Sequence, residues 1–199
     1  MTAGQDEPRR RGARVGKADW ISAGLALLAE RGVDAVAVEP LCLRLGVTKG
    51  SFYWHFADRA ALHAAMLESW RRTGTTDVAD RVEEAGGGPH QKLARLTSLA
   101  AANPRAGLEV ALRAWARRDP AAAAAVAEVD AIRTAYVAGL LVQMGLRPAT
   151  AMRRSRLIYL VLLGGYLVEG SSGGLAGADI WAEVLRLVRV RLPAEGEPG

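Results

Sequence analysis

The 199-residue sequence predicts an all-α protein. Apolar residues recur at helical spacing in one segment after another, beginning with Ile21, Leu25 and Leu28. No stretch alternates apolar and polar residues with a period of two, which argues against a sheet. We therefore expect an N-terminal three-helix unit that contains a helix-turn-helix, followed by a C-terminal helical unit.

The first three helices are expected to be short and closely spaced. The first covers residues 17–31 and stops at Gly32, the second covers 38–45, and the third covers 49–56. Gly46 supplies the positive φ that ends the second helix, and Thr48 is a suitable N-cap whose hydroxyl can accept a backbone N–H. Two short helices joined around a glycine predict a helix-turn-helix, whose second helix normally enters the major groove of DNA.

The remaining helices are longer. Asp58 can cap a fourth helix that carries Leu62, Met66 and Trp70, and a glycine run at 86–88 interrupts the pattern after it. Periodic segments follow near 91–101, 105–117, 119–144, 148–169 and 178–191. The longest apolar run, at 157–168, is shorter than the roughly 20 residues that a membrane span needs, so it predicts a helix covered on most sides within the protein.

The third helix carries an unusual amount of polar and aromatic surface. Phe52 and Phe56 lie four residues apart and can share one buried face. The outer face then presents side chains that can contact phosphates or base edges, together with a glycine that lets the helix approach DNA closely: Lys49, Gly50, Ser51, Tyr53, Trp54 and His55. The alternative is that the last three pack beneath a neighbouring helix.

Residues 46–62, GVTKGSFYWHFADRAAL, resemble the DNA-reading core of the TetR (tetracycline repressor) family of transcriptional regulators. The resemblance covers roughly residues 17–67, about a quarter of the chain. It implies that the residues that meet DNA are Lys17, Thr48, Lys49, Gly50, Ser51, Tyr53, Trp54, His55 and Arg59. Two departures from the family pattern stand in the second helix, where Ala37 replaces a hydroxyl cap and Pro40 lies in the first turn.

The resemblance also implies roles for the C-terminal part. An effector pocket is expected among the helices of that part, with the candidates Met66, Trp70, Leu96, Leu112, Trp115, Tyr136, Leu140 and Tyr159. A four-helix bundle between two copies is expected from the last two long helices, with the candidates Leu157, Leu160, Val161, Gly164, Gly165, Val168, Trp181, Leu185 and Val188. A filled core and a purely intrachain packing of these helices are the respective alternatives.

Charge and composition are compatible with a DNA-binding protein. The formal net charge is +5, and arginines gather in residues 1–16, which we expect to form a disordered basic arm. The helix-turn-helix domain is then 17–57, the effector-binding and dimerisation domain 58–192, and a disordered tail 193–199. The single cysteine, Cys42, rules out an intramolecular disulfide, and with no apolar leader segment we expect a cytoplasmic protein.

An enzyme is not expected, because no catalytic motif, metal-ligand cluster or cofactor-binding loop is present in the sequence. We predict a homodimeric regulator, most simply a repressor that leaves a palindromic operator when it binds a hydrophobic small molecule. The alternatives are an activator of the same family, or a dimeric helical protein that binds small molecules or partners without DNA.

Overall fold

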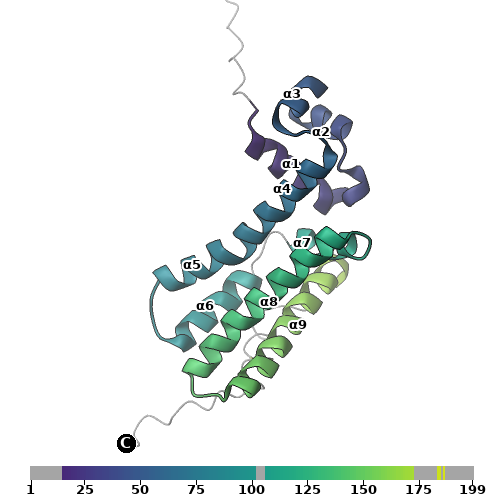
Figure 1. Cartoon of the computed structure of the whole chain (residues 1–199). Coiled ribbons are helices and arrows are strands. Elements are labelled where there is room, and N and C mark those ends of the chain that lie inside the picture. Colours follow the sequence, from purple (N-terminus) through teal and green to yellow (C-terminus); the bar gives the residue numbers. More distant parts are fainter. Residues whose placement is uncertain (1–14, 102–105, 173–182, 185, 187–199) are drawn as a thin grey trace, which may run out of the picture.

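The computed structural model describes residues 15–101 and 106–172, together with Glu183, Val184 and Arg186. These parts of the chain form helices and no strands, which confirms the all-α prediction. The elements, shown in Figure 1, are α1 (Lys17–Arg31), a 3₁₀ turn η1 (Val33–Ala35), α2 (Val38–Leu45), α3 (Lys49–His55), α4 (Arg59–Arg71), a π turn η2 (Arg72–Thr76), α5 (Asp77–Glu84), α6 (Pro89–Ala101), α7 (Ala106–Ala116), α8 (Pro120–Gln143) and α9 (Pro148–Ser172).

Most expected helix limits agree with these bounds. Two expected segments fall wholly or largely outside the described residues, namely the arm 1–16 apart from its last two residues and the tail 193–199. The expected helix at 178–191 is described only at Glu183, Val184 and Arg186. Three candidate interface residues, Trp181, Leu185 and Val188, also lie outside the described part of the chain.

The turn between α2 and α3 has the predicted geometry but not the predicted cap. Gly46 has φ of 67° and ends α2 in the left-handed conformation. Thr48 occupies the N-cap position of α3, yet its side chain makes no capping hydrogen bond, so that part of the prediction is wrong. The Ser51 N–H, which a capping hydroxyl would use, donates to the Thr48 backbone oxygen at 3.0 Å instead.

The helix-turn-helix is held by an aromatic core. Phe52 and Phe56 are both buried, as predicted, and the Phe52 ring meets the fully buried Trp20 ring edge-on at 5.3 Å between centroids. This core continues without interruption through α1 and α4 into α7 and α8, where Leu112 and Val129 belong to it. The N-terminal head, residues 17–57, therefore packs directly against the body, residues 58–101 and 106–172, and the two parts share one core.

The body is a layered arrangement of the longer helices. In Figure 1, α4 runs from the head toward α5, and α8 and α9 lie side by side. A second apolar cluster, which includes Leu93, Leu141 and Ile158, joins α6, α8 and α9. No helix in the described ranges is long and apolar enough to cross a bilayer.

The apolar run in α9 is less covered than predicted. Ile158 and Tyr166 are buried, whereas Leu157, Leu160 and Leu167 are each more than half exposed. The apolar residues of this run therefore lie on two faces of α9. One face packs against other helices of the chain, and the other face is exposed.

Candidate DNA-reading surface and internal cavity

The outer face of α3 presents large aromatic side chains to solvent. Trp54 is 81% exposed and Tyr53 is 60% exposed, so neither packs beneath a neighbouring helix of this chain. Thr48, Lys49 and Gly50 at the start of the helix are also exposed, and Ser51 is half-buried. Exposed apolar surface of this size on a short helix is typical of a contact site for another molecule.

An ion pair that sequence reasoning missed restrains Lys49. Its Nζ donates to the carboxylate of Glu39 on α2, and both side chains are largely exposed. The hydrogen bond and charge of Glu39 raise the pKa of Lys49, while the same hydrogen bond lowers the pKa of Glu39. No local pattern connects residues ten apart on two different helices, so only the helix-turn-helix geometry reveals this pair.

Three other predicted DNA contacts, Lys17, His55 and Arg59, also have partners within the protein. The Lys17 Nζ lies 5.3 Å from the centre of the Phe56 ring, and the half-buried His55 places its Nε2 3.1 Å from the Val15 backbone oxygen. Arg59 donates from Nη2 to the Val33 backbone oxygen at 2.9 Å, which ties the start of α4 to the turn after α1. These contacts orient the residues around one end of the head.

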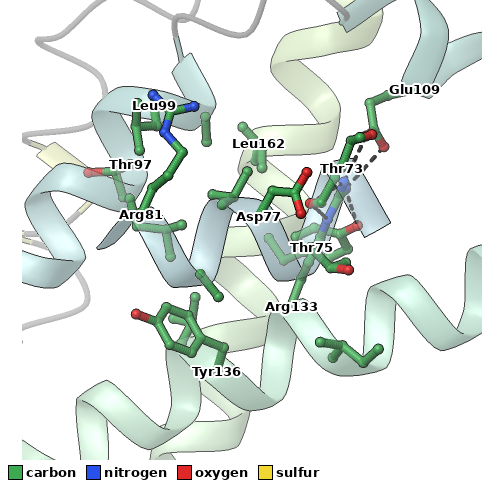
Figure 2. A pocket seen from close by; sticks show the side chains of 18 of the residues that line it. Thr73, Thr75, Asp77, Arg81, Thr97, Leu99, Glu109, Arg133, Tyr136 and Leu162 are labelled. Atoms are coloured by element: carbon green, nitrogen blue, oxygen red, sulfur yellow. Dashed lines mark hydrogen bonds and ion pairs between the residues drawn. The ribbon is translucent and has the colours of Figure 1, made fainter. Parts of the chain in front are cut away.

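A cavity of about 680 Å³ is lined by residues of the π turn and of α4, α5, α6, α7, α8 and α9. Figure 2 shows Arg133, Glu109 and Thr75 at one side of it and Tyr136 at another. Four of the eight pocket candidates line it, namely Trp70, Leu96, Tyr136 and Tyr159. The other four are buried elsewhere in the packed core: Met66, Leu112, Trp115 and Leu140.

One wall of the cavity contains a buried carboxylate. Glu109 on α7, only 4% exposed, accepts two hydrogen bonds from Arg133 of α8, at 2.8 and 3.1 Å. Trp70 of α4 donates its Nε1–H to the same carboxylate at 3.1 Å, and Arg113 donates to it from Nη1 at 2.9 Å. Burial raises the pKa of Glu109, but the hydrogen bond and charge of Arg133 outweigh it, so the pKa of this carboxyl lies below its usual range.

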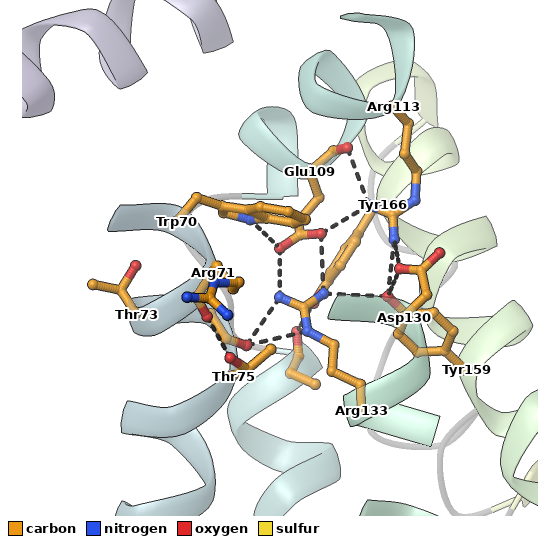
Figure 3. A network of polar contacts seen from close by, with 12 residues as sticks. Trp70, Arg71, Thr73, Thr75, Glu109, Arg113, Asp130, Arg133, Tyr159 and Tyr166 are labelled. Atoms are coloured by element: carbon orange, nitrogen blue, oxygen red, sulfur yellow. Dashed lines mark hydrogen bonds and ion pairs between the residues drawn. The ribbon is translucent and has the colours of Figure 1, made fainter. Parts of the chain in front are cut away.

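The polar network continues from Glu109 to α9 (Figure 3). The Tyr159 hydroxyl donates to Asp130 at 2.6 Å and accepts from Arg113 at 2.8 Å. Burial, with a hydrogen bond to Asp130, raises the pKa of Tyr159 to about 12 despite the nearby charge of Arg133, so the phenol stays protonated at neutral pH. Two carboxylates and two guanidinium groups thus balance one another beside a largely apolar space.

The lining of the cavity has the composition of a small-molecule binding site. The cavity joins apolar residues such as Leu96, Ile158 and Leu162 to a few convergent polar groups, which is the usual composition of a small-molecule site. Among the described residues, no cluster of histidine, cysteine and acidic side chains is placed to hold a metal ion.

The open face of α9 forms a continuous apolar stripe. Leu157, Leu160 and Val161 are exposed at helical spacing, with Leu160 at 62%. Gly164 extends the stripe by one turn, and a Cβ added there would have no other atom within 4 Å. Gly165 and Val168 follow and are half-buried.

Residues 21–66 match the family model described as bacterial regulatory proteins, tetR family. The class A tetracycline repressor protein from transposon 1721 of Escherichia coli is 38% identical over 64 residues, which are 32% of this chain and 30% of that protein. The class G tetracycline repressor protein of Vibrio anguillarum is 39% identical over 59 residues, or 30% and 28% of the two chains. The match thus spans less than a third of the length of these relatives.

Solved structures extend the likeness to the body. The reduced form of NemR from E. coli covers 89% of this chain and 99% of its own, with a TM-score of 0.74 at 18% identity. A transcriptional regulator from Rhodococcus sp. covers 87% and 94%, with a TM-score of 0.70 at 19% identity. FadR from Bacillus subtilis in complex with stearoyl-CoA covers 85% and 95%, with a TM-score of 0.63 at 17% identity. At these identities the likeness shows a shared fold.

Proposed function

Because the chain belongs to the TetR family of transcriptional regulators, we propose that it is a cytoplasmic homodimeric repressor that a small apolar molecule releases from a near-palindromic operator. The observation that carries this proposal is the exposed Tyr53 and Trp54 surface on α3, in a head that shares one core with a body containing a cavity.

In this proposal the two α3 helices of a dimer enter successive major grooves, with half-sites about 34–36 Å apart. Base preference comes from three side chains of α3, namely Lys49, Ser51 and Trp54. Phosphate contacts supply much of the affinity and come from Lys17, Tyr53, His55 and Arg59. Thr48 and Gly50 let the helix N-terminus approach the DNA backbone.

The apolar stripe of α9 supplies the dimer contact in this proposal. Apolar side chains exposed at i, i+3 and i+4 are the pattern by which two helices pack face to face. Leu160→Glu places a charge at the centre of the stripe and should convert the dimer into a monomer in analytical ultracentrifugation. Val142→Glu, on the exposed side of α8, is the matched control and should stay dimeric. A dimer that survives Leu160→Glu would contradict this interface.

The cavity is the proposed effector site. Its volume lies in the range of small-molecule sites, and its apolar lining favours a hydrophobic ligand. FadR from B. subtilis, which shares the fold, holds stearoyl-CoA in its solved structure. An effector that binds one arrangement of the two heads better than another would shift the population away from the DNA-binding state.

The central experiment is a gel shift with DNA flanking the protein's own gene, with and without hydrophobic small molecules from the same cell. Lys49→Ala and Trp54→Ala should each weaken operator binding more than binding to random DNA, because each removes a contact to bases. Val142→Ala should leave both unchanged. Raising salt should lower affinity steeply, since phosphate contacts release counterions. A flat salt response, or equal losses on operator and random DNA, would contradict the assigned contacts.

A further inference from the structure

Helix α4 does not run regularly into α5. Residues 72–76 form a π turn, in which the Asp77 N–H donates to the Arg72 carbonyl oxygen. Threonine hydroxyls satisfy two carbonyl oxygens before the turn: Thr73 donates to Ser69 at 2.9 Å, and Thr75 donates to Arg71. π turns are uncommon and frequently lie at functional sites. Side-chain hydrogen bonds therefore support the backbone where α4 ends.

Arg133 of α8 provides the long-range support of this turn. Its Nε and Nη2 both donate to the Gly74 carbonyl oxygen, at 3.1 and 2.9 Å. Its other hydrogen bonds go to the two oxygens of Glu109 and, at 3.3 Å, to the Tyr159 hydroxyl. A guanidinium has five N–H groups, and these contacts occupy all of them.

The same contact borders the cavity. Trp70, Thr73, Gly74, Glu109 and Arg133 all line it, and Figure 3 shows the guanidinium between the carboxylate and the turn. Because Arg133 has no uncommitted N–H, a molecule in the cavity can bond to it only by replacing a present acceptor. The Glu109 carboxylate is charged and bidentate, whereas the Gly74 and Tyr159 oxygens are neutral acceptors and the weaker competitors. Of these two, only the Gly74 oxygen accepts two of the N–H groups and belongs to the π turn.

We propose that the two hydrogen bonds from Arg133 to the Gly74 carbonyl oxygen transmit occupancy of the cavity to α4. This inference rests on the proposed function. A ligand with an acceptor oxygen takes the place of the Gly74 oxygen, the π turn loses its long-range support, and the end of α4 rearranges. Since α4 shares its core with α1 and α3, the orientation of the DNA-reading helix changes with it.

Gly74→Ala tests this contact without a ligand. A Cβ at Gly74 would lie 2.7 Å from the Arg133 Nη2, and the end of a flexible side chain can move where backbone cannot. The backbone of Gly74 is not in the left-handed region, so alanine is tolerated there. The matched control is Gly139→Ala in α8, where an added Cβ would have no other atom within 4 Å.

The measurement is amide hydrogen exchange of residues 70–78 by mass spectrometry. Gly74→Ala should exchange faster than the parent, by about tenfold, and Gly139→Ala should not. Arg133→Lys keeps the charge beside Glu109 but lacks the planar pair of donors, so it should give the same acceleration. The double variant should add nothing further. The inference would be overturned if residues 70–78 of Gly74→Ala exchanged at the rate of the unsubstituted protein. It would also be overturned if the two substitutions accelerated exchange additively in the double variant.

Operator binding separates this inference from the proposed function. Gly74→Ala should lower operator affinity by about tenfold in the absence of any ligand, within the usual range of allosteric coupling. Lys49→Ala should lower it with exchange in residues 70–78 unchanged. Faster exchange at unaltered operator affinity would overturn the coupling to the head. Failure of the parent to bind DNA would refute the proposed function, while the exchange data would still decide whether Arg133 holds the turn.

Discussion

Phe52 and Trp54 lie two residues apart in α3, and their replacement by alanine should have opposite consequences. Phe52 is fully buried, and its ring centroid lies 5.3 Å from that of Trp20 and 5.6 Å from that of Phe56. Phe52→Ala should lower the free energy of unfolding by about 3–5 kcal/mol, because the vacated space cannot collapse fully. For a chain of this length that corresponds to a fall in Tm of about 6–20 °C.

Trp54→Ala removes a side chain that is 81% exposed, so the free energy of unfolding should change by less than about 0.5 kcal/mol. Operator affinity should nevertheless fall, because the lost surface is the one proposed to meet bases. Differential scanning calorimetry measures the first effect and gel shifts the second. If Trp54→Ala melts as early as Phe52→Ala, the tryptophan supports the fold and the division of α3 into a buried and a reading face is wrong.

Further predictions concern charged groups. Glu39→Gln removes the carboxylate that pairs with Lys49 and should raise affinity for random-sequence DNA several-fold in fluorescence anisotropy at low salt; weaker binding would mean that Glu39 itself contacts DNA. Glu109→Leu leaves Arg133 buried without its carboxylate and should cost about 3–5 kcal/mol in urea unfolding, an estimate that an unchanged midpoint would contradict. Burial holds the pKa of His63 in the folded protein below its ordinary value of 6.5. Between the folded-state pKa and 6.5, the unfolded chain therefore binds more protons than the folded one. Stability should therefore fall as pH drops below about 6.5, and His63→Gln should lose that part of the pH dependence in thermal unfolding.

The limits of the head helices could be predicted because each depends on a local signal. Gly32 and Gly46 adopt positive φ, and the Asp58 carboxylate accepts the Ala61 N–H at 2.8 Å, all within a few residues of the helix ends. The π turn could not be predicted in this way. Its sequence, RTGTT, contains no marker of the geometry, and the Arg133 guanidinium that supports it lies 59 residues away in the chain.

The cavity shows a similar limit. Trp70 and Trp115 are both large, buried aromatic residues, yet only the first lines the cavity. Apolar periodicity in the sequence identifies which residues of a helix are buried. It does not show which of those buried residues line a cavity and which pack against other side chains. The burial of Glu109 was missed for a related reason. Its spacing from Arg113 is also that of an ordinary ion pair on a helix surface, and the residues that cover it come from other helices.

The polar network beside the cavity joins α4 and α7, the two helices that α1 of the head packs against. Helix α1 packs on α4 and also on α7. Its contact with α4 is unusually close, since a Cβ added to Gly24 would lie 2.7 Å from the Met66 Sδ. A close-packed contact of this kind transmits a displacement instead of absorbing it. The Trp70 to Glu109 hydrogen bond joins α4 to α7 at the cavity wall. A rearrangement of the cavity wall should therefore displace α4 and α7 together and rotate the head as a unit.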